Sequence, residues 1–399
     1  MKKFGLFALA LSLSVSVMSA PKLANYNAGN AAYQQAQPTP PLPDDARPFY
    51  EDYYNEKDEA KKYEKAKIFL EKFPNIDPYW RKSPLAYIAR YELKQVYNKC
   101  SEADKTFFAT PNEANLNGFL SACDAWISKS PKPDAYFSTR MPLGTGYGVL
   151  VGFYKDTARG MQYTEKALPM LAQATAPEGW KQPEWDSFRK DNTARLIQYQ
   201  GLYYLRQTPP DNEKTIKFLT DAANIKEGTA YKDPNTYLLR AEATTALYTK
   251  LNAEYNALSN DEKTGEKGKG LLGKIYPVVE KMTNDYARVM ALTEGKSEYK
   301  AVYDDARGQG EAFAKFLNKD FKIEELVKHF KPDVSAADMK IKTEESTTTP
   351  PPNAPKGGKG GKAPAPAPAG GTAKPDAGGS EKPATPTKAA TKPPVKKRK

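Results

Sequence analysis

Apolar residues recur at helical spacing along most of this chain. Between residues 47 and 331 they return every three or four positions, which places them on one face of an α-helix. Three regular stripes are Leu85, Ile88, Ala89, Val96, Tyr97 and Cys100; Leu116, Phe119, Leu120, Cys123, Trp126 and Ile127; and Leu271, Ile275, Val278, Met282, Tyr286 and Val289. No comparable stretch alternates with a period of two, so the sequence predicts an all-α fold without a β-sheet.

Prolines divide this helical region into units of similar length. Four of them are separated by 49, 50 and 51 residues: Pro84, Pro133, Pro183 and Pro234. Each is expected near the start of a helix pair, and the second helices are expected to begin near Asn112, Gly160 and Asn212. Self-similarity with a period of about 20 to 50 residues is typical of solenoids. We therefore predict an α-solenoid of about five or six helical hairpins over residues 47–335.

Some local signals refine the expected helix boundaries. The segment from Thr110 to Glu113 has the spacing of a capping box, while Asp211 and Asp233 are predicted N-caps. Residues 144–148 are glycine-rich and predict a loop with close helix packing. Residues 265–270 predict a linker. Neither segment has the strand context or the spacing of a nucleotide-binding motif.

Part of the helical region resembles the tetratricopeptide-repeat family. Residues 214–222 are similar to the second helix of such a repeat, with small residues at Thr215 and Ala222 where adjacent helices approach. Residues 233–241 resemble the beginning of the next first helix, and residues 63–74 resemble a second helix that ends at the family's proline. The period near 50 is longer than the family's 34 residues. The resemblance implies a concave surface that binds a protein or peptide, without catalysis.

The two ends of the chain differ from this region. Residues 1–20 combine a positive start, an apolar run and small residues at Ser19 and Ala20, which predicts a secretory signal peptide. An uncleaved membrane anchor is the alternative. Residues 21–46 predict a polar linker, and residues 336–399 predict a disordered tail rich in Pro, Ala, Gly and Lys. We therefore expect an exported protein, periplasmic or extracellular, in a bacterial cell envelope.

Most of the net charge of +12 lies in the tail. Residues 353–399 hold eleven Lys or Arg and two acids, whereas residues 4–352 carry a net charge of only +1. We expect the tail to bind an anionic envelope polymer or lipid surface, and we do not expect nucleic acid as the partner, because the tail lacks aromatic residues for stacking bases. The basic residues nearest the end are Lys388, Lys392, Lys396, Lys397, Arg398 and Lys399.

Residue counts restrict the chemistry of the chain. There is one histidine, His329, and there are two cysteines, Cys100 and Cys123, so we expect no metal, no cofactor and no catalytic triad. Both cysteines lie on predicted apolar helix faces. They are interpreted either as a disulfide or as two small buried hydrophobic residues, and the sequence leaves both alternatives open.

Aromatic residues crowd the first third of the chain. They are Phe49, Tyr50, Tyr53, Tyr54, Tyr79, Trp80, Tyr87 and Tyr91. Such a cluster forms either a binding surface or packing between helices, and we favour packing because most members continue helical stripes. The sequence as a whole predicts an exported, non-enzymatic scaffold that mediates protein–protein interaction. The alternatives are a binding module for the cell wall or an anionic glycan that uses the basic tail, and a lytic wall enzyme.

The basic tail generates a testable prediction. A peptide of residues 353–399 should bind several unrelated polyanions, and its affinity should fall steeply with salt, because charges on an extended chain bind through counterion release. Titration against anionic lipid vesicles and an acidic polysaccharide at low and high salt measures this. Salt-tolerant binding to one polymer alone would identify a specific ligand motif instead.

Overall fold

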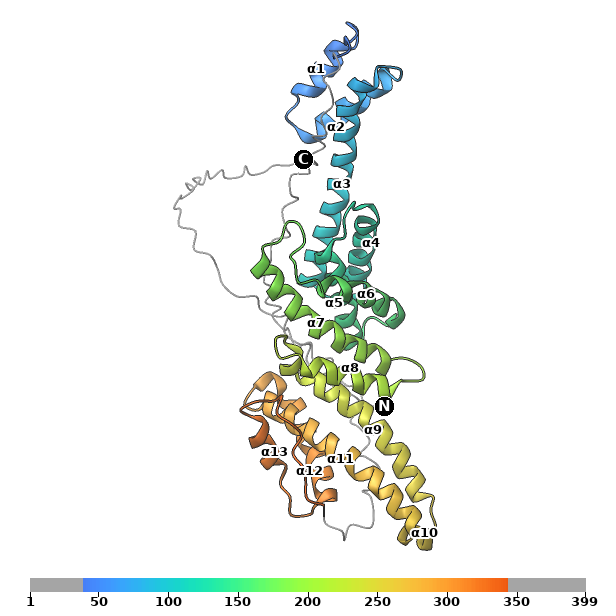
Figure 1. The fold of residues 1–399 in the computed structure, drawn as a ribbon, viewed down its shortest axis with the longest axis vertical. Helices are drawn as coiled ribbons and strands as arrows, with labels where there is room; N and C mark the ends of the chain where they lie inside the picture. Colours follow the sequence, from blue (N-terminus) through green and yellow to red (C-terminus); the bar gives the residue numbers. More distant parts are fainter. Residues whose placement is uncertain (1–38, 344–399) are drawn as a thin grey trace, which may run out of the picture.

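The structure, a computed structural model, describes residues 39–343, and no strand occurs in that range (Figure 1). The predicted all-α class is therefore confirmed for these residues. The α-helices are α1 (Arg47–Asn55), α2 (Glu59–Lys72), α3 (Pro78–Ala109), α4 (Glu113–Lys129), α5 (Ala135–Val151), α6 (Thr157–Leu171), α7 (Gln182–Leu205), α8 (Asn212–Asn224), α9 (Pro234–Asn256), α10 (Asn260–Thr264), α11 (Glu266–Thr293), α12 (Lys300–Leu317) and α13 (Ile323–Phe330). Two short 3₁₀ turns are η1 (Ala230–Lys232) and η2 (Ser297–Tyr299).

The helices follow one another along an elongated molecule, with α1 at one end and α10 at the other (Figure 1). Helices close in sequence pack together: α1 on α2, α3 on α4, α5 on α6, α7 on α8, and α9 on α11. Several predicted boundaries agree with this arrangement. The helices α5, α7 and α9 begin near Pro133, Pro183 and Pro234, and α4, α6 and α8 begin close to the positions expected for second helices.

Three apolar clusters form the main cores of the described chain. An N-terminal core surrounds Ala46, Phe69 and Ile76. A central core extends from α3 to the start of α9, and a C-terminal core extends from the end of α8 to Ile341. Two long helices connect them, because α3 contributes to the first two cores and α9 to the last two. The elongated molecule therefore has no single centre that holds all of its helices.

The helix α3 departs from the prediction. It begins at Pro78, so Pro84 lies inside the helix rather than near its start. Its predicted apolar stripe is fully buried only toward the C-terminal half, at Cys100, whereas Leu85 is 48% exposed. The reason is that α4 has 17 residues and α3 has 32, so α4 covers only part of α3. Thr110 ends α3 instead of capping α4, which is capped by Asn112. The predicted caps at Asp211 and Asp233 are confirmed.

The loop expected at residues 144–148 is absent, because these residues lie inside α5. The close packing expected there is present: a Cβ atom added at Gly146 would overlap the ring of Tyr199 on α7. The linker expected at residues 265–270 is also wrong. Gly265 alone separates α10 from α11, and the remaining residues of that segment belong to α11. At Gly146 and Gly268 the close approach of a ring or of backbone outweighs the poor helix propensity of glycine, whereas a Cβ atom at Gly270 would meet nothing within 4 Å.

Buried arginine–aspartate pairs connect helices both between successive helix pairs and within the α9/α11 pair. Arg140 Nε on α5 lies 2.9 Å from Asp104 Oδ1 on α3. Further along, Arg195 on α7 pairs with Asp233, the N-cap of α9, and Arg240 Nε on α9 lies 2.9 Å from Asp285 Oδ2 on α11. Burial alone would lower the pKa of Arg240, but Asp285 raises it above its ordinary value. Breaking a buried pair of this kind costs roughly 3–5 kcal/mol, because one charge is left without its partner.

A disulfide connects α3 to α4. Cys100 and Cys123 are bonded, their Cα atoms are 4.6 Å apart, and both side chains are fully buried in the central core. The cysteines are therefore at once a covalent link and part of the apolar packing. The bond closes a loop with a sequence separation of 23 residues. It fixes α4 against α3 beside the point where α3 leaves the central core.

The boundaries of two predicted segments differ from those in the structure. The polar linker was expected to end at residue 46, but Trp80 Nε1 donates a hydrogen bond to Pro40 O at 3.1 Å, and Ala46 is buried. The predicted tail boundary at residue 336 falls within an extended segment that packs on α11, in which Ile341 is buried. The predicted signal peptide and the basic residues from Lys388 to Lys399 lie outside the described residues.

Close packing at Gly146 can be tested by substitution. Gly146→Ala should lower the free energy of unfolding by about 1–3 kcal/mol, because the added methyl group overlaps the Tyr199 ring. Gly118→Ala on α4 is the matched control. A Cβ atom there meets nothing within 4 Å, so the substitution should stabilise the chain by about 0.5–1 kcal/mol. Denaturant unfolding of both variants measures the difference, and equal effects would contradict the packing at Gly146.

The disulfide generates a second prediction. The oxidised protein should show no titratable thiol when denatured, and the Cys100→Ala/Cys123→Ala variant should lose about 3 kcal/mol of unfolding free energy, because the open chain gains conformational freedom. Denaturant unfolding with and without reductant measures this. Reductant should destabilise the wild type and leave the variant unchanged. Two thiols in protein prepared without reductant would rule the bond out.

Candidate protein-binding surface

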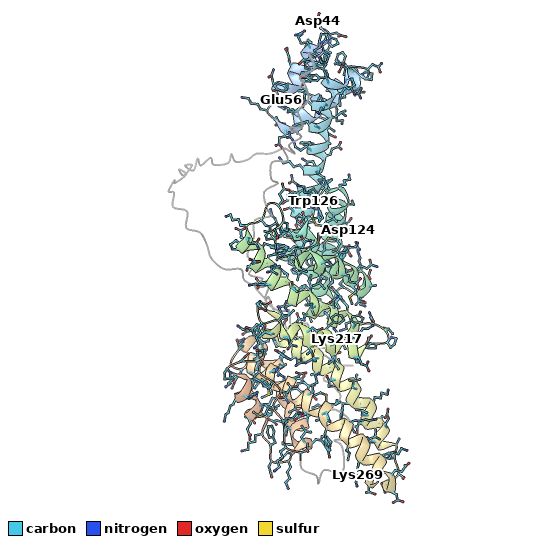
Figure 2. The ribbon with its side chains drawn as sticks, viewed as in Figure 1. Asp44, Glu56, Asp124, Trp126, Lys217 and Lys269 are labelled. Carbon is cyan, nitrogen blue, oxygen red and sulfur yellow. A yellow bond between two sulfur atoms is a disulfide. The ribbon has the colours of Figure 1, made fainter. Side chains whose placement is uncertain are left out.

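The N-caps of α2 and α3 help to position the aromatic residues at the N-terminal end of the molecule. Asp58 accepts a hydrogen bond from Lys61 N and begins α2, and Asp77 accepts one from Tyr79 N and begins α3. The turns before these caps bring α1, α2 and the first part of α3 together around the N-terminal core. Figure 2 shows this end of the molecule, with Asp44 and Glu56 labelled on it.

A row of tyrosines crosses these helices. The ring of Tyr53 on α1 lies 6.1 Å from that of Tyr87 on α3, and Tyr87 lies 6.4 Å from Tyr91. Tyr91 in turn stacks on Tyr63 of α2 at 4.6 Å. Rings at these separations gain from edge-to-face and offset contacts beyond their apolar burial. The row therefore joins all three helices through the buried Tyr53 and three tyrosines that are partly open to solvent.

Cations lie over several of these rings. Lys62 Nζ is 5.2 Å from the ring centre of Tyr53 and 5.6 Å from that of Tyr87. It also donates a hydrogen bond to Tyr54 O at 2.8 Å. Arg90 lies 5.3 Å from the ring centre of Tyr87. Attraction between a cation and the negative ring face fixes these long side chains in place.

Ion pairs and hydrogen bonds border the row. Lys65 Nζ lies 2.7 Å from Glu56 Oε2 and 2.8 Å from Asp52 Oδ1. The hydrogen bond from Lys65, together with that from the Asp58 N–H, lowers the pKa of Glu56 to about 2. Tyr63 donates a hydrogen bond to Glu92 Oε1 at 2.9 Å, and this bond raises the pKa of Tyr63. Glu56 is thus held as a carboxylate and Tyr63 as a neutral phenol near neutral pH.

Exposed apolar side chains gather at the same end. In residues 39–343 the large hydrophobic side chains with high exposure are Tyr54 (62%), Tyr79 (53%), Leu85 (48%) and Ile68 (43%), and all four belong to α1, α2 or α3. Single exposed apolar residues are ordinary, but their concentration on one part of a molecule is typical of an interaction surface. We call α1, α2 and residues 78–92 of α3, with these four side chains and the tyrosine row, the N-terminal surface.

The aromatic residues singled out from the sequence divide between the two interpretations. Phe49 and Trp80 pack on the N-terminal core, and Tyr53 is only 2% exposed. Tyr54 and Tyr79 face solvent instead. Some of these aromatic residues therefore pack between helices, and the others are exposed and available for binding. The sequence did not single out Leu85 as exposed, because its position continues a stripe that is buried further along α3.

A second candidate site lies near the opposite end. A hollow of about 740 Å³ between the adjoining ends of α9 and α11 is lined in part by Glu254, Leu258, Glu262 and Leu271. Glu262 caps α10 by a hydrogen bond from Ser259 N and pairs with Lys267, and these contacts lower its pKa to about 2. A general acid requires the opposite shift, toward neutral pH. The hollow therefore offers no acid–base chemistry through this residue.

The one histidine of the chain contacts the main chain of the segment after α13. His329 lies in the last turn of α13, with Nε2 3.0 Å from Ala337 O. In residues 39–343, no three or more His, Cys, Asp or Glu side chains are grouped so that they could hold a metal ion. None of the helices in this part of the chain is both long and apolar enough to cross a membrane.

Comparison of the chain with protein-family models, curated proteins and solved structures found no match. The resemblance to the tetratricopeptide-repeat family therefore stays a prediction.

Proposed function

We propose that this protein is an exported, non-enzymatic scaffold of a bacterial cell envelope and that its N-terminal surface binds a protein partner. The observation that carries the proposal is the concentration of exposed apolar side chains on α1, α2 and α3. Tyrosine contributes large contact area at low entropic cost and is frequent among the residues that dominate binding energy. The export step rests on the signal peptide predicted for residues 1–20.

The succession of helix pairs supports a scaffold rather than an enzyme. We interpret the pairs α3/α4, α5/α6, α7/α8 and α9/α11 as units of an α-solenoid, in which each unit contacts mainly its neighbours. Such a molecule presents extended surfaces. The protruding part of α3 adds a face, around Leu85, that continues the stripe covered by α4 further along the helix.

The cations of the N-terminal surface favour a protein over a glycan. Sugars bind to aromatic side chains by stacking on open ring faces. Lys62 already lies over Tyr53 and Tyr87, and Lys67 lies over Tyr63 at 5.1 Å. These faces are therefore partly covered, whereas the apolar side chains of Leu85 and Ile68 have no use in stacking on a sugar. Binding to a wall polymer or anionic glycan is retained as the alternative, with the basic tail as its carrier.

The proposal is tested with a triple variant, Tyr54→Ser/Tyr79→Ser/Leu85→Ser. A partner should first be captured by cross-linking the full chain in envelope extract, and then purified for titration. The variant should bind that partner at least about 10-fold more weakly, since each lost anchor removes roughly 1 kcal/mol or more. Its thermal unfolding should change little, because the three side chains are largely exposed.

Tyr204→Ser supplies the matched control, since Tyr204 is a partly exposed aromatic residue on α7, away from the N-terminal surface. It should retain full affinity. Equal binding by the triple variant and the wild type would overturn the proposed surface. If the chain instead sediments with purified cell-wall glycan, and does so in a salt-sensitive way, the wall-binding alternative replaces the protein-binding function.

A further inference from the structure

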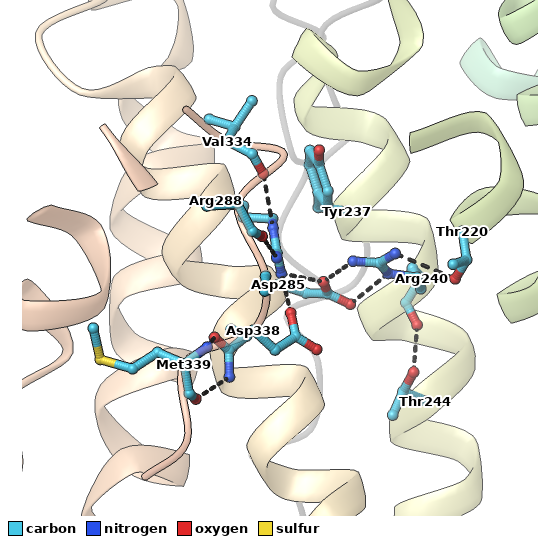
Figure 3. A network of polar contacts seen from close by, with 12 residues as sticks. Thr220, Tyr237, Arg240, Thr244, Asp285, Arg288, Val334, Asp338 and Met339 are labelled. Atoms are coloured by element: carbon cyan, nitrogen blue, oxygen red, sulfur yellow. Dashed lines mark hydrogen bonds and ion pairs between the residues drawn. The ribbon is translucent and has the colours of Figure 1, made fainter. Parts of the chain in front are cut away.

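The segment after α13 makes a turn at residues 333–336 and then crosses α11 in extended form. Three residues of α11, spaced four apart on one face of the helix, hold it: Glu280, Asn284 and Arg288. We call residues 333–342 the strap. It carries no regular helical hydrogen bonds of its own, and its order comes from contacts with the helices beneath it. Figure 3 shows Arg288 and Asp285 of α11 beside Val334, Asp338 and Met339 of the strap.

The three α11 side chains contact the main chain of the strap. Asn284 forms a two-way pair with Met339: its Nδ2 donates to Met339 O at 3.1 Å, and Met339 N donates to its Oδ1 at 2.9 Å. Ile341 N donates to Glu280 Oε1 at 2.8 Å. Main-chain groups are the same in almost every residue, so these contacts recognise an extended backbone rather than a particular sequence.

Arg288 extends the same pattern to the start of the strap. Its Nε donates to Val334 O at 2.9 Å, and its Nη2 donates to Ala336 O at 2.7 Å. A third contact, 2.7 Å long, pairs its Nη1 with Asp338 Oδ1. The guanidinium therefore holds two carbonyls of the turn at residues 333–336 and one acid of the extended part that follows.

The side chains of the strap add a simple chemical pattern. Val334 and Ile341 are buried, and Ala336 and Met339 are partly buried against the C-terminal core. Asp338 faces Arg288 instead. An occupant of this site therefore needs aliphatic residues at roughly alternate positions and one acid opposite the arginine.

The α11 face is matched to an occupant of this kind, and the strap completes its burial. Asn284 is fully buried, and the Arg288 side chain is only 6% exposed beside the fully buried Asp285. Without an extended chain, the Asn284 amide would lose both bonds to Met339, and Arg288 would lose both carbonyls. Water would replace these partners when the strap leaves, so each bond contributes about 0.5–1.5 kcal/mol net to holding an occupant. The face is thus built to take up a peptide backbone.

We propose that this face of α11 is a binding groove for an extended peptide and that the strap fills it as an internal ligand. A partner protein's extended segment, with aliphatic residues at alternate positions and one acid, competes for the same groove. The strap can leave without breaking a helix, because it is not part of one: beyond a turn at residues 333–336, its bonds are to side chains of α11 and of neighbouring elements. The groove lies far from the N-terminal surface and does not depend on the function proposed for it (Figure 1).

The test uses the full chain with a weakened strap, Met339→Pro/Ile341→Asp. Proline removes the N–H that Asn284 accepts, and aspartate cannot occupy the apolar site of Ile341. The probe is a fluorescent synthetic peptide with the sequence of residues 332–343. The weakened-strap chain should bind it saturably, and at least about 100-fold more tightly than the wild type, whose own strap competes at high effective concentration.

Two matched variants identify the binding residue. Adding Asn284→Ala to the weakened-strap chain should lower its affinity for the peptide at least about 10-fold. Adding Asn256→Ala, at an exposed position on α9, should leave the affinity unchanged. A probe peptide carrying proline in place of Met339 should not bind. A folded weakened-strap chain that does not bind the original peptide would overturn the proposal.

Hydrogen exchange on the wild-type chain keeps the inference testable if the weakened-strap chain does not fold. The amides of Met339 and Ile341 should exchange faster than those of Val289 and Met290 in α11, because the strap opens locally. If all four exchange at the same slow rate, the strap opens only when the chain unfolds and cannot be displaced. That result would also overturn the proposal, and it would leave the N-terminal surface untouched.

Discussion

Buried arginine–aspartate pairs hold this elongated chain together at contacts between and within its helix pairs. An elongated molecule with several apolar cores cannot rely on one central mass of hydrophobic side chains, so each junction needs its own contacts. Arg140 and Arg195 each reach from one helix pair to an aspartate of a neighbouring pair or its cap, and Arg240 joins the two helices of the α9/α11 pair. Charged pairs of this kind define one relative position for two helices, whereas apolar faces alone tolerate sliding. The strap adds a further contact of this type, since Arg288 binds both Asp285 and Asp338.

The sequence predicted the helices better than it predicted their surroundings. Periodicity depends on local spacing, so most helices and many of their boundaries could be expected from the order of residues alone. The loop expected at residues 144–148 was wrong because glycine is ambiguous in a single sequence: it permits a turn, and it also permits two helices to approach closely. Only the position of Tyr199 on a distant helix decides between these outcomes. Arginine and aspartate are likewise too common for their pairing to be predicted without the fold.

The candidate sites show the same limit. The aromatic cluster was visible in the sequence, but the exposure of Tyr54 and the burial of Tyr53 depend on how α1 lies against α2 and α3. Leu85 was expected to be buried because its stripe is continuous, and it is exposed because α4 is shorter than α3. The groove on α11 left no recognisable signal, since Glu280, Asn284 and Arg288 have the spacing of any polar helix face.

The unequal lengths of α3 and α4 have a mechanical consequence. The 32 residues of α3 span about 48 Å, and the 17 residues of α4 lie beside only about 26 Å of that length. The Cys100–Cys123 bond clamps the shared portion, so the remainder of α3 acts as a stiff lever anchored at one end. A load applied to the N-terminal surface would be carried down this lever as a torque on the clamped segment. The disulfide then resists sliding of α3 along α4. A partner bound at the N-terminal end of α3 would pull on a helix that is covalently attached to α4.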